Sequence, residues 1–397
     1  MKENINAISP FHNTSLNALV IRVEEAGESP EQSEEYMEEL LFLVHSAGYK
    51  VFEAHSYSWR RPDPATFLTK GRVEEIKKRI EEHKKEIDFV LVDAELSAVQ
   101  VRNLENIWSK PVTDREGLIL EIFAHNARTA QAKAQVELAR LEYELPRLTH
   151  QWTHLSRERG GIGLRGGGGE QQLEADRRKI RKQITKLREK LKEFQQQAEI
   201  RRSGRETLPR VALVGYTNVG KSTLMRLISK SSVLVADRLF ATLDTTTRKV
   251  TLNGHPFLLS DTVGFIRKLP PKLLEAFHTT LAEVREADLL LFVMDASKPG
   301  YMEQLRIVER TLEKIGAADI PILIVMNKID KLTPAQRELL EESWRAQIPY
   351  PTVFISATEK INVQELYDKL TEMVSSVKSL KNSPPDNLLR VGERKLS

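Results

Sequence analysis

The chain has 397 residues, of which 40% are hydrophobic and 29% are charged, and its formal net charge is +4. This length exceeds what one hydrophobic core supports, so we expect two to three domains. No stretch approaches the roughly 18 consecutive apolar residues of a membrane span, and the N-terminal segment lacks the apolar core of a secretion signal. The absence of cysteine excludes disulfides, thiolate metal sites and cysteine nucleophiles. We therefore expect a cytoplasmic protein, with peripheral attachment to a membrane left open.

Strand-like and helix-like patterns alternate through the first part of the chain. The pattern predicts strands at residues 18–23, 49–54 and 88–94 and helices at residues 33–47 and 71–84. Strands that alternate with helices indicate a small α/β domain, which we assign to residues 1–125. This region holds no recognised active-site motif, and we interpret its isolated His55 as a surface or capping histidine.

From residue 126 onward, apolar residues recur in steps of three and four. Two such seams occur, at residues 134, 138, 141, 145, 148, 152 and 155 and at residues 173, 180, 184, 187, 191, 194 and 198. A heptad seam indicates a helix that packs against a partner, so residues 126–202 predict an antiparallel helical hairpin, or arm. The glycine-rich segment 157–172 would form its exposed, mobile tip. Pro146 should kink the first helix or remove one of its hydrogen bonds.

Positive charge concentrates on the second half of this arm. Between residues 173 and 202 there are eleven Lys or Arg and five Asp or Glu. An ordinary solvated coiled-coil face explains this pattern, but so does an electrostatic footprint for RNA. We favour RNA, because a purely structural hairpin needs only a short turn and not a glycine-rich, arginine-bearing tip. The candidate RNA contacts are Arg157, Arg159, Arg165, Arg177, Arg178 and Lys179.

After a linker at residues 203–209, the segment VALVGYTNVGKST (211–223) contains the pattern Gly215-x4-Gly220-Lys221-Ser222. It lies between a predicted strand and a predicted helix, which is the setting of a phosphate-binding loop. The glycines let backbone N–H groups surround a phosphate at the positive end of the helix. Lys221 would reach the β- and γ-phosphates, and Ser222 would bind Mg²⁺.

Three further motifs follow in order, each at the end of a predicted strand. Asp261-x-x-Gly264 would hold Mg²⁺ through water and meet the γ-phosphate. Asn327-Lys328-x-Asp330 would recognise guanine, because the carboxylate can accept hydrogen bonds from both the N1–H and the 2-amino group. Ser356-Ala357 would offer a backbone N–H to the guanine 6-oxo group. This combination resembles the translation-factor-like GTPases and covers about residues 209–373; we define the G domain as residues 210–373.

The first switch should lie in LFATLDTTTR (239–248), where one of four threonines would meet Mg²⁺ and the γ-phosphate. Many GTPases place a glutamine directly after the DxxG glycine to orient the attacking water. Here that residue is Phe265, which cannot bind water, so we expect slow intrinsic hydrolysis that a partner accelerates. A second interpretation, compatible with the first, is that Phe265 packs under the switch. After the G domain we expect a polar, loosely ordered tail at residues 374–397.

A closer resemblance rests on GYTNVGKST, LFATLD, DTVGFIRKLP and RGGIGLRGGGGEQQLE, which together are similar to the HflX family of ribosome-associated GTPases. The resemblance implies an N-terminal α/β domain with a long helical hairpin, followed by a Ras-like P-loop domain with a mostly parallel sheet. It implies that Thr242 binds Mg²⁺, although Asp244-Thr245 departs from the usual Asp-Pro of the family. It also implies a GTPase that binds the large (50S) ribosomal subunit and its rRNA, and that splits or rescues stalled or idle ribosomes under stress.

The motifs assign Lys221 and Gly264 to catalysis and Ser222 to the metal, with Asp261 acting through water. The resemblance adds Thr242 to both groups. The expected GTP-binding residues are Gly215, Tyr216, Thr217, Asn218, Val219, Gly220, Lys221, Ser222, Thr223, Phe240, Ala241, Thr242, Leu243, Asp244, Asp261, Thr262, Val263, Gly264, Asn327, Lys328, Asp330, Ser356, Ala357 and Thr358.

Two alternatives remain open at this point. One is a GTPase of the tRNA-modification type, which would need a second catalytic motif that the sequence does not contain. The other is a scaffold in which the arm forms a coiled-coil dimer. We expect a chain that is monomeric away from the ribosome.

Overall fold

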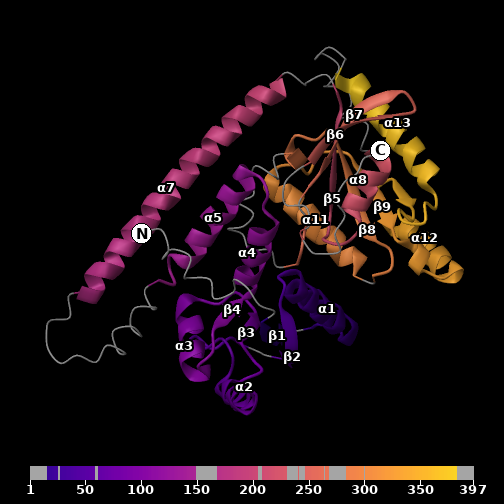
Figure 1. The fold of residues 1–397 in the computed structure, drawn as a ribbon. Coiled ribbons are helices and arrows are strands. Elements are labelled where there is room, and N and C mark those ends of the chain that lie inside the picture. The colour runs from indigo at the N-terminus through magenta and orange to yellow at the C-terminus, as the bar shows by residue number, and fades with distance from the viewer. Residues whose placement is uncertain are drawn as a thin grey trace. The chain divides into compact units, whose positions relative to one another are not determined.

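The computed structural model describes residues 16–25, 27–58, 61–148, 168–203, 208–229, 240, 246–262, 264–267, 283–298 and 300–381. The chain divides into two compact units, Met1–Lys192 and Glu193–Ser397. Figure 1 labels the elements of both. In the first unit they are β1 (Asn17–Glu24), α1 (Pro30–Ser46), β2 (Lys50–Ser58), α2 (Lys70–Glu82), β3 (Phe89–Asp93), α3 (Ala98–Trp108), β4 (Val112–Asp114), α4 (Arg115–Asn126) and α5 (Ala130–Glu144), followed by α7 (Gly168–Ser203), whose last residues fall in the second unit.

The first unit is built on a four-stranded parallel sheet in the order β2-β1-β3-β4. Every residue of β3 is buried, as expected for a parallel strand covered on both faces. The core cluster joins β1, through Leu19 and Ile21, to residues of α2 and α3 such as Ile76 and Leu104. The three strands and two helices predicted in this region are confirmed, whereas α3, β4 and α4 were not predicted.

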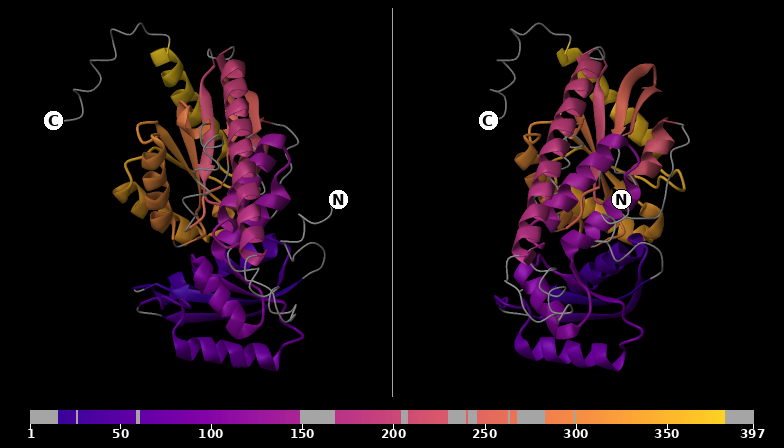
Figure 2. Two further views of the ribbon diagram at one scale, coloured as in Figure 1. Left: turned by 90° about the vertical axis from the view of Figure 1, so that its left-hand side faces the viewer. Right: turned by 60° about the vertical axis from the view of Figure 1, so that its left-hand side comes forward.

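The arm consists of α5 and α7, which pack side by side (Figure 2). Leu138 and Leu141 of α5 share a buried cluster with Ile180 and Ile184 of α7, so the structure pairs the two predicted seams. Pro146 does not kink the first helix, because α5 ends at Glu144. Leu145 keeps helical backbone angles and its N–H still donates to the Leu141 carbonyl, and Pro146, which has no N–H, follows the helix end. Residues 149–167, which include Trp152, Leu155 and most of the predicted tip, lie outside the described residues.

The second unit contains a six-stranded sheet in the order β10-β9-β8-β5-β7-β6, in which only the β6–β7 pairing is antiparallel. Helix α13 corrects the predicted tail, because it continues to Lys381 with Val374 only 1% exposed. The elements are β5 (Arg210–Gly215), α8 (Lys221–Ser229), β6 (Thr246–Leu252), β7 (His255–Asp261), β8 (Leu289–Asp295), α11 (Tyr301–Ile315), β9 (Ile322–Asn327), η2 (Ile329–Lys331), α12 (Pro334–Gln347), β10 (Thr352–Phe354) and α13 (Val363–Lys381).

A buried ion-pair network joins α4 to the first sheet. Arg115, the first residue of α4, is 3% exposed and donates hydrogen bonds to Asp93 Oδ1 at 2.7 Å and to Glu39 Oε1 at 2.5 Å. Removing one partner of such a network leaves buried charge without compensation, which costs far more than losing an exposed ion pair.

We therefore predict that Arg115→Met lowers the free energy of unfolding of the first unit by about 3–5 kcal/mol. The measurement is hydrogen exchange of peptides from β3, which reports this unit alone. The control is Arg188→Gln, which breaks an ion pair with Glu142 whose arginine is 67% exposed and should cost less than about 1 kcal/mol. Equal protection in the two variants would contradict the prediction.

Candidate functional site

The loop between β5 and α8 has the backbone that the glycine pattern predicts. Gly215 and Gly220 have φ angles of 147° and 98°, which disfavour any other residue. A Cβ on Gly215 would lie 2.2 Å from the Val293 carbonyl oxygen, and one on Gly220 would lie 2.4 Å from Asn327 Nδ2. The glycines therefore allow the loop to pass closely over β8 and β9 before α8 begins at Lys221.

Lys221 is buried inside this loop. Its Nζ donates to the carbonyl oxygens of Gly215 at 3.0 Å and Tyr216 at 2.6 Å. Burial lowers the pKa of the ammonium group to about 8, and the nearby charge of Asp261 opposes that shift. A cation held mainly by neutral carbonyls is a site that favours an incoming anion.

The end of β7 approaches the same loop. Ser222 Oγ donates to Asp261 Oδ2 at 2.8 Å, so two of the three residues predicted to act at the Mg²⁺ site lie next to each other. A Cβ on Gly264 would lie 2.8 Å from Lys221 Nζ and 3.0 Å from Thr217 Cα. Only glycine permits this approach, which places the backbone after Asp261 directly against the lysine.

Phe265 connects this segment to the loop through its backbone. Its N–H donates to the Gly215 carbonyl at 2.9 Å, and its carbonyl accepts from the Thr217 N–H at 2.8 Å. The phenyl ring is 4% exposed and belongs to the main core cluster of the second unit. Phe265 is thus buried in the core, and its side chain contributes no polar group to the site.

The residues predicted to bind the base converge at the ends of β9 and β10. Asn327 Nδ2 donates to the Val219 carbonyl at 2.8 Å, and Asn327 Oδ1 accepts from the Ala357 N–H at 3.0 Å. Asp330 follows in η2 and is exposed. Ser356 is fully buried and its Oγ accepts from the Glu359 N–H at 3.1 Å, which fixes the loop after β10.

Sequence reasoning missed Asp295, the last residue of β8. Its Oδ2 lies 2.8 Å from Lys328 Nζ, and that amine also donates to the Asn218 carbonyl at 2.6 Å. Lys328 has a φ of 67°, a conformation that this double anchor holds in place. The available signal was an aspartate at the end of the buried strand LLLFVMD, at the same sheet edge as the other motifs.

Some predicted residues cannot be placed. Ala241, Thr242, Leu243, Asp244 and Val263 lie outside the described residues, as do Arg157, Arg159 and Arg165. Phe240 is described and is 2% exposed, with a φ of 54°. On α7, Arg178 and Lys179 are exposed and Arg177 is half-buried. The predicted phosphate, DxxG and base residues that the structure describes therefore meet at one site, whereas the arginines and the lysine on α7 belong to the arm.

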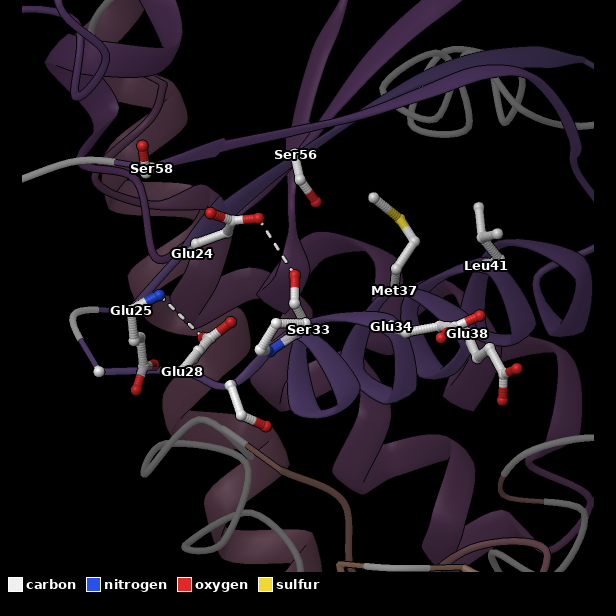
Figure 3. A pocket seen from close by; sticks show the side chains of 13 residues that line it. Glu24, Glu25, Glu28, Ser33, Glu34, Met37, Glu38, Leu41, Ser56 and Ser58 are labelled. Atoms are coloured by element: carbon white, nitrogen blue, oxygen red, sulfur yellow. Dashed lines mark hydrogen bonds between the residues drawn. The ribbon is translucent and has the colours of Figure 1, made fainter.

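A second hollow, of about 840 Å³, lies in the first unit between α1 and the ends of β1 and β2 (Figure 3). Five glutamates line it. Ser33 Oγ donates to Glu24 Oε1 at 3.1 Å, the Glu25 N–H donates to Glu28 Oε1 at 2.8 Å, and Glu28 also pairs with the buried Arg22. No group of three or more His, Asp or Glu among the described residues is arranged to hold a metal. No helix in the described part of the chain combines the length and apolarity needed to span a bilayer.

Three family models match consecutive parts of the chain. They are described as GTP-binding GTPase N-terminal at residues 34–124, GTP-binding GTPase Middle Region at residues 126–205, and 50S ribosome-binding GTPase at residues 210–328. Each match falls on one of the segments that the sequence distinguishes: the α/β part, the arm and the nucleotide site.

Curated relatives match almost the whole chain. The GTPase HflX of Flavobacterium psychrophilum is 44% identical over 95% of this chain and 92% of its own length. The GTPase HflX of Escherichia coli (strain K12) is 42% identical over 86% of this chain and 79% of its own length. A crystal structure of a GTP-binding protein from Sulfolobus solfataricus in complex with GDP is 26% identical, with a TM-score of 0.47 over 91% of this chain and 100% of that one. A TM-score below 0.5 supports no conclusion about this chain.

The pKa of Lys221 gives a prediction for nucleotide binding. A phosphate beside the ammonium group of Lys221 raises the pKa of that group. Below pH 8 the group is protonated in both the free and the nucleotide-bound protein, so binding there does not depend on pH through Lys221. Above pH 8 the free site has lost the proton and must take it up again, so GDP affinity should fall by up to about tenfold per pH unit. Calorimetry in two buffers with different ionisation heats should show proton uptake at about pH 9. Absence of uptake in the wild type would contradict this, and Lys221→Met, which has no ammonium group at this position, is the control.

The exposed carboxylate of Asp330 gives a second prediction. Asp330→Asn replaces one acceptor oxygen by a donor, which opposes the guanine 2-amino group but suits the 2-oxo group of xanthine. We expect GDP to bind about 3 kcal/mol more weakly, roughly a hundredfold, and xanthosine diphosphate to bind more tightly than to the wild type. Competition with a fluorescent guanine nucleotide measures both affinities. Asp319→Asn, at another exposed aspartate, should change neither; an unchanged base preference in the Asp330 variant would remove Asp330 from base recognition.

Proposed function

The chain belongs to the HflX family of GTPases, and we propose that it is a GTP-dependent switch that binds the large ribosomal subunit and splits or rescues stalled or idle ribosomes. The family model matched at residues 210–328 is described as a 50S ribosome-binding GTPase, which supports this assignment. The observation that carries the proposal is the presence, in one chain, of a complete phosphate-loop geometry and a helical arm with an exposed basic face.

In this proposal the nucleotide lies over the loop from Gly215 to Thr223. The N–H groups of the loop and Lys221 bind the phosphates, while Asp330 binds the guanine. The Ala357 N–H, which donates to Asn327 Oδ1 in the structure, would turn to the guanine 6-oxo group. The Ser222 hydroxyl and the Asp261 carboxylate are hard oxygen donors within 2.8 Å of each other, so they fit Mg²⁺. When bound, Mg²⁺ neutralises charge on the β- and γ-phosphates. Thr242 is the proposed third protein group of that site.

Hydrolysis by the chain alone should be slow. Phe265 occupies the position at which many GTPases orient water, and its ring is held in the core. The described site retains loop dipoles and Lys221, which stabilise charge on the transferred phosphoryl group without positioning a nucleophile. A polar group from a partner, or one brought in as the switches order, would supply the missing function. We propose that the large subunit provides this stimulus.

The arm supplies the surface for RNA. Ile180 and Ile184 of α7 face α5, whereas Arg178, Lys179 and Lys182 are exposed. The described part of the apolar seam packs within the chain, so these residues are not free to form the coiled-coil dimer of a scaffold, which favours a monomer. The exposed cations leave a charged face for phosphate groups, whose neutralisation releases counterions. GTP would favour the docked state, and hydrolysis would release it.

The proposal predicts that purified large subunits accelerate GTP hydrolysis by the full chain. The double variant Arg178→Glu/Lys179→Glu should need at least about tenfold more subunits for half-maximal stimulation, because phosphate contacts are lost. The concentration that it needs should rise less steeply with salt than that of the wild type, because fewer counterions are released on binding. Its hydrolysis rate without subunits should equal that of the wild type. Arg345→Glu, at an arginine 72% exposed on α12, is the matched control and should behave as the wild type. Hydrolysis that is indifferent to large subunits would sink the proposed function.

A further inference from the structure

Asp114 is a buried carboxylate in the first unit, away from the nucleotide site. It is the last residue of β4 and the N-cap of α4, and it is fully buried. Its two oxygens accept four hydrogen bonds, two each. Oδ1 accepts from the Gly117 N–H at 2.9 Å and from the Tyr143 hydroxyl at 2.7 Å, while Oδ2 accepts from the Leu96 N–H at 3.2 Å and from Arg147 at 2.9 Å.

Two of these donors belong to the base of the arm. Tyr143 lies in the last turn of α5, and Arg147 follows three residues after that helix ends. The Arg147 guanidinium stacks on the Tyr143 ring with its carbon 3.5 Å from the centroid, and it also donates to the carbonyls of Tyr143 and Leu96. A cation that caps carbonyls at a helix C-terminus and pairs with a buried carboxylate fixes the direction in which the helix leaves the sheet.

The fit around this carboxylate is tight. A Cβ on Gly117 would lie 2.8 Å from the Tyr143 hydroxyl and 2.6 Å from Thr113 Oγ1. Any side chain at this position would therefore push Tyr143 away from Asp114. Burial and the charge of Asp114 raise the pKa of Tyr143 well above its usual value, so the hydroxyl keeps the proton that it donates.

We infer that Asp114 is a positioning residue that locks the base of the arm, through Tyr143 and Arg147, to the carboxyl edge of the first sheet, so that the arm moves as one rigid lever with that sheet. Three elements meet at this one carboxylate: the end of β4, the start of α4 and the end of α5. Asparagine at this position can still cap α4, but without the charge it cannot hold the guanidinium and the phenol together at full strength.

The direct test measures the distance between two spin labels, one on the first unit and one on the arm, by double electron–electron resonance in the full chain. Because the chain has no cysteine, Glu81→Cys on α2 and Glu189→Cys on α7, both exposed, can be labelled without background. The parent should show one narrow distance. Asp114→Asn should broaden the distribution by about twofold or more, because the buried charge that orders Arg147 is gone.

Two further variants keep the test decisive should Asp114→Asn fold poorly. Gly117→Ala displaces Tyr143 and should also broaden the distribution, and Tyr143→Phe should do so to a smaller degree. Arg188→Gln, which breaks the exposed ion pair with Glu142 within the arm, should leave it unchanged. A distribution as narrow as the parent's in folded Asp114→Asn or Gly117→Ala chains would overturn the inference.

A consequence for activity rests on the proposed function. Loss of this pre-organisation should raise the concentration of large subunits needed for half-maximal stimulation by roughly tenfold and leave the hydrolysis rate without subunits unchanged. If the wild type ignores the subunits, the proposed function fails while the distance measurement still decides the role of Asp114. If the wild type responds and the variants respond equally at broadened distances, a rigid lever is not needed for binding.

Discussion

The buried ammonium group of Lys221 is the constraint around which the nucleotide site is arranged. Two backbone carbonyls accept hydrogen bonds from it in a buried place. Burial lowers its pKa to about 8, and the nearby charge of Asp261 opposes that shift. A phosphate relieves this cost directly, so affinity for nucleotide follows from burial as well as from charge. The ammonium group also lies against the backbone at Gly264, so a phosphate bound to Lys221 would lie close to the segment that follows Asp261.

The glycines and the base-binding motif shape the loop that surrounds Lys221, and the buried ring of Phe265 lies in the core beside it. Gly215 and Gly220 let the loop run against β8 and β9, and Asn327 and Lys328 bond to carbonyls of that loop. Base recognition and phosphate binding therefore share one rigid structure. Hydrolysis is different, because the described residues provide charge stabilisation but leave the orientation of water to another group. The proposed stimulation by the large subunit rests on this division of roles.

Much of the site could be predicted from sequence because its motifs are local. Gly-x4-Gly-Lys-Ser, Asp-x-x-Gly and Asn-Lys-x-Asp each set their own backbone, and strand ends at one sheet edge bring them together. The buried ion pairs of Asp114 and Arg115 could not be predicted, because charged residues in a sequence are expected at the surface. Helix α4 is buried on nearly all sides, so its sequence lacks the apolar periodicity that would have revealed the helix. By contrast, the extension of α13 was readable in Leu366, Leu370 and Val374, which recur every four residues.

One chain carries both a phosphate-binding site and a basic arm, and we propose that the nucleotide state sets its affinity for the large ribosomal subunit. The most direct measurement is co-sedimentation of the full chain with purified large subunits in a non-hydrolysable GTP analogue and in GDP. We predict at least about tenfold tighter binding with the analogue, equivalent to roughly 1.4 kcal/mol, and loss of this difference in Lys221→Met. Equal binding in the two nucleotides would contradict the account.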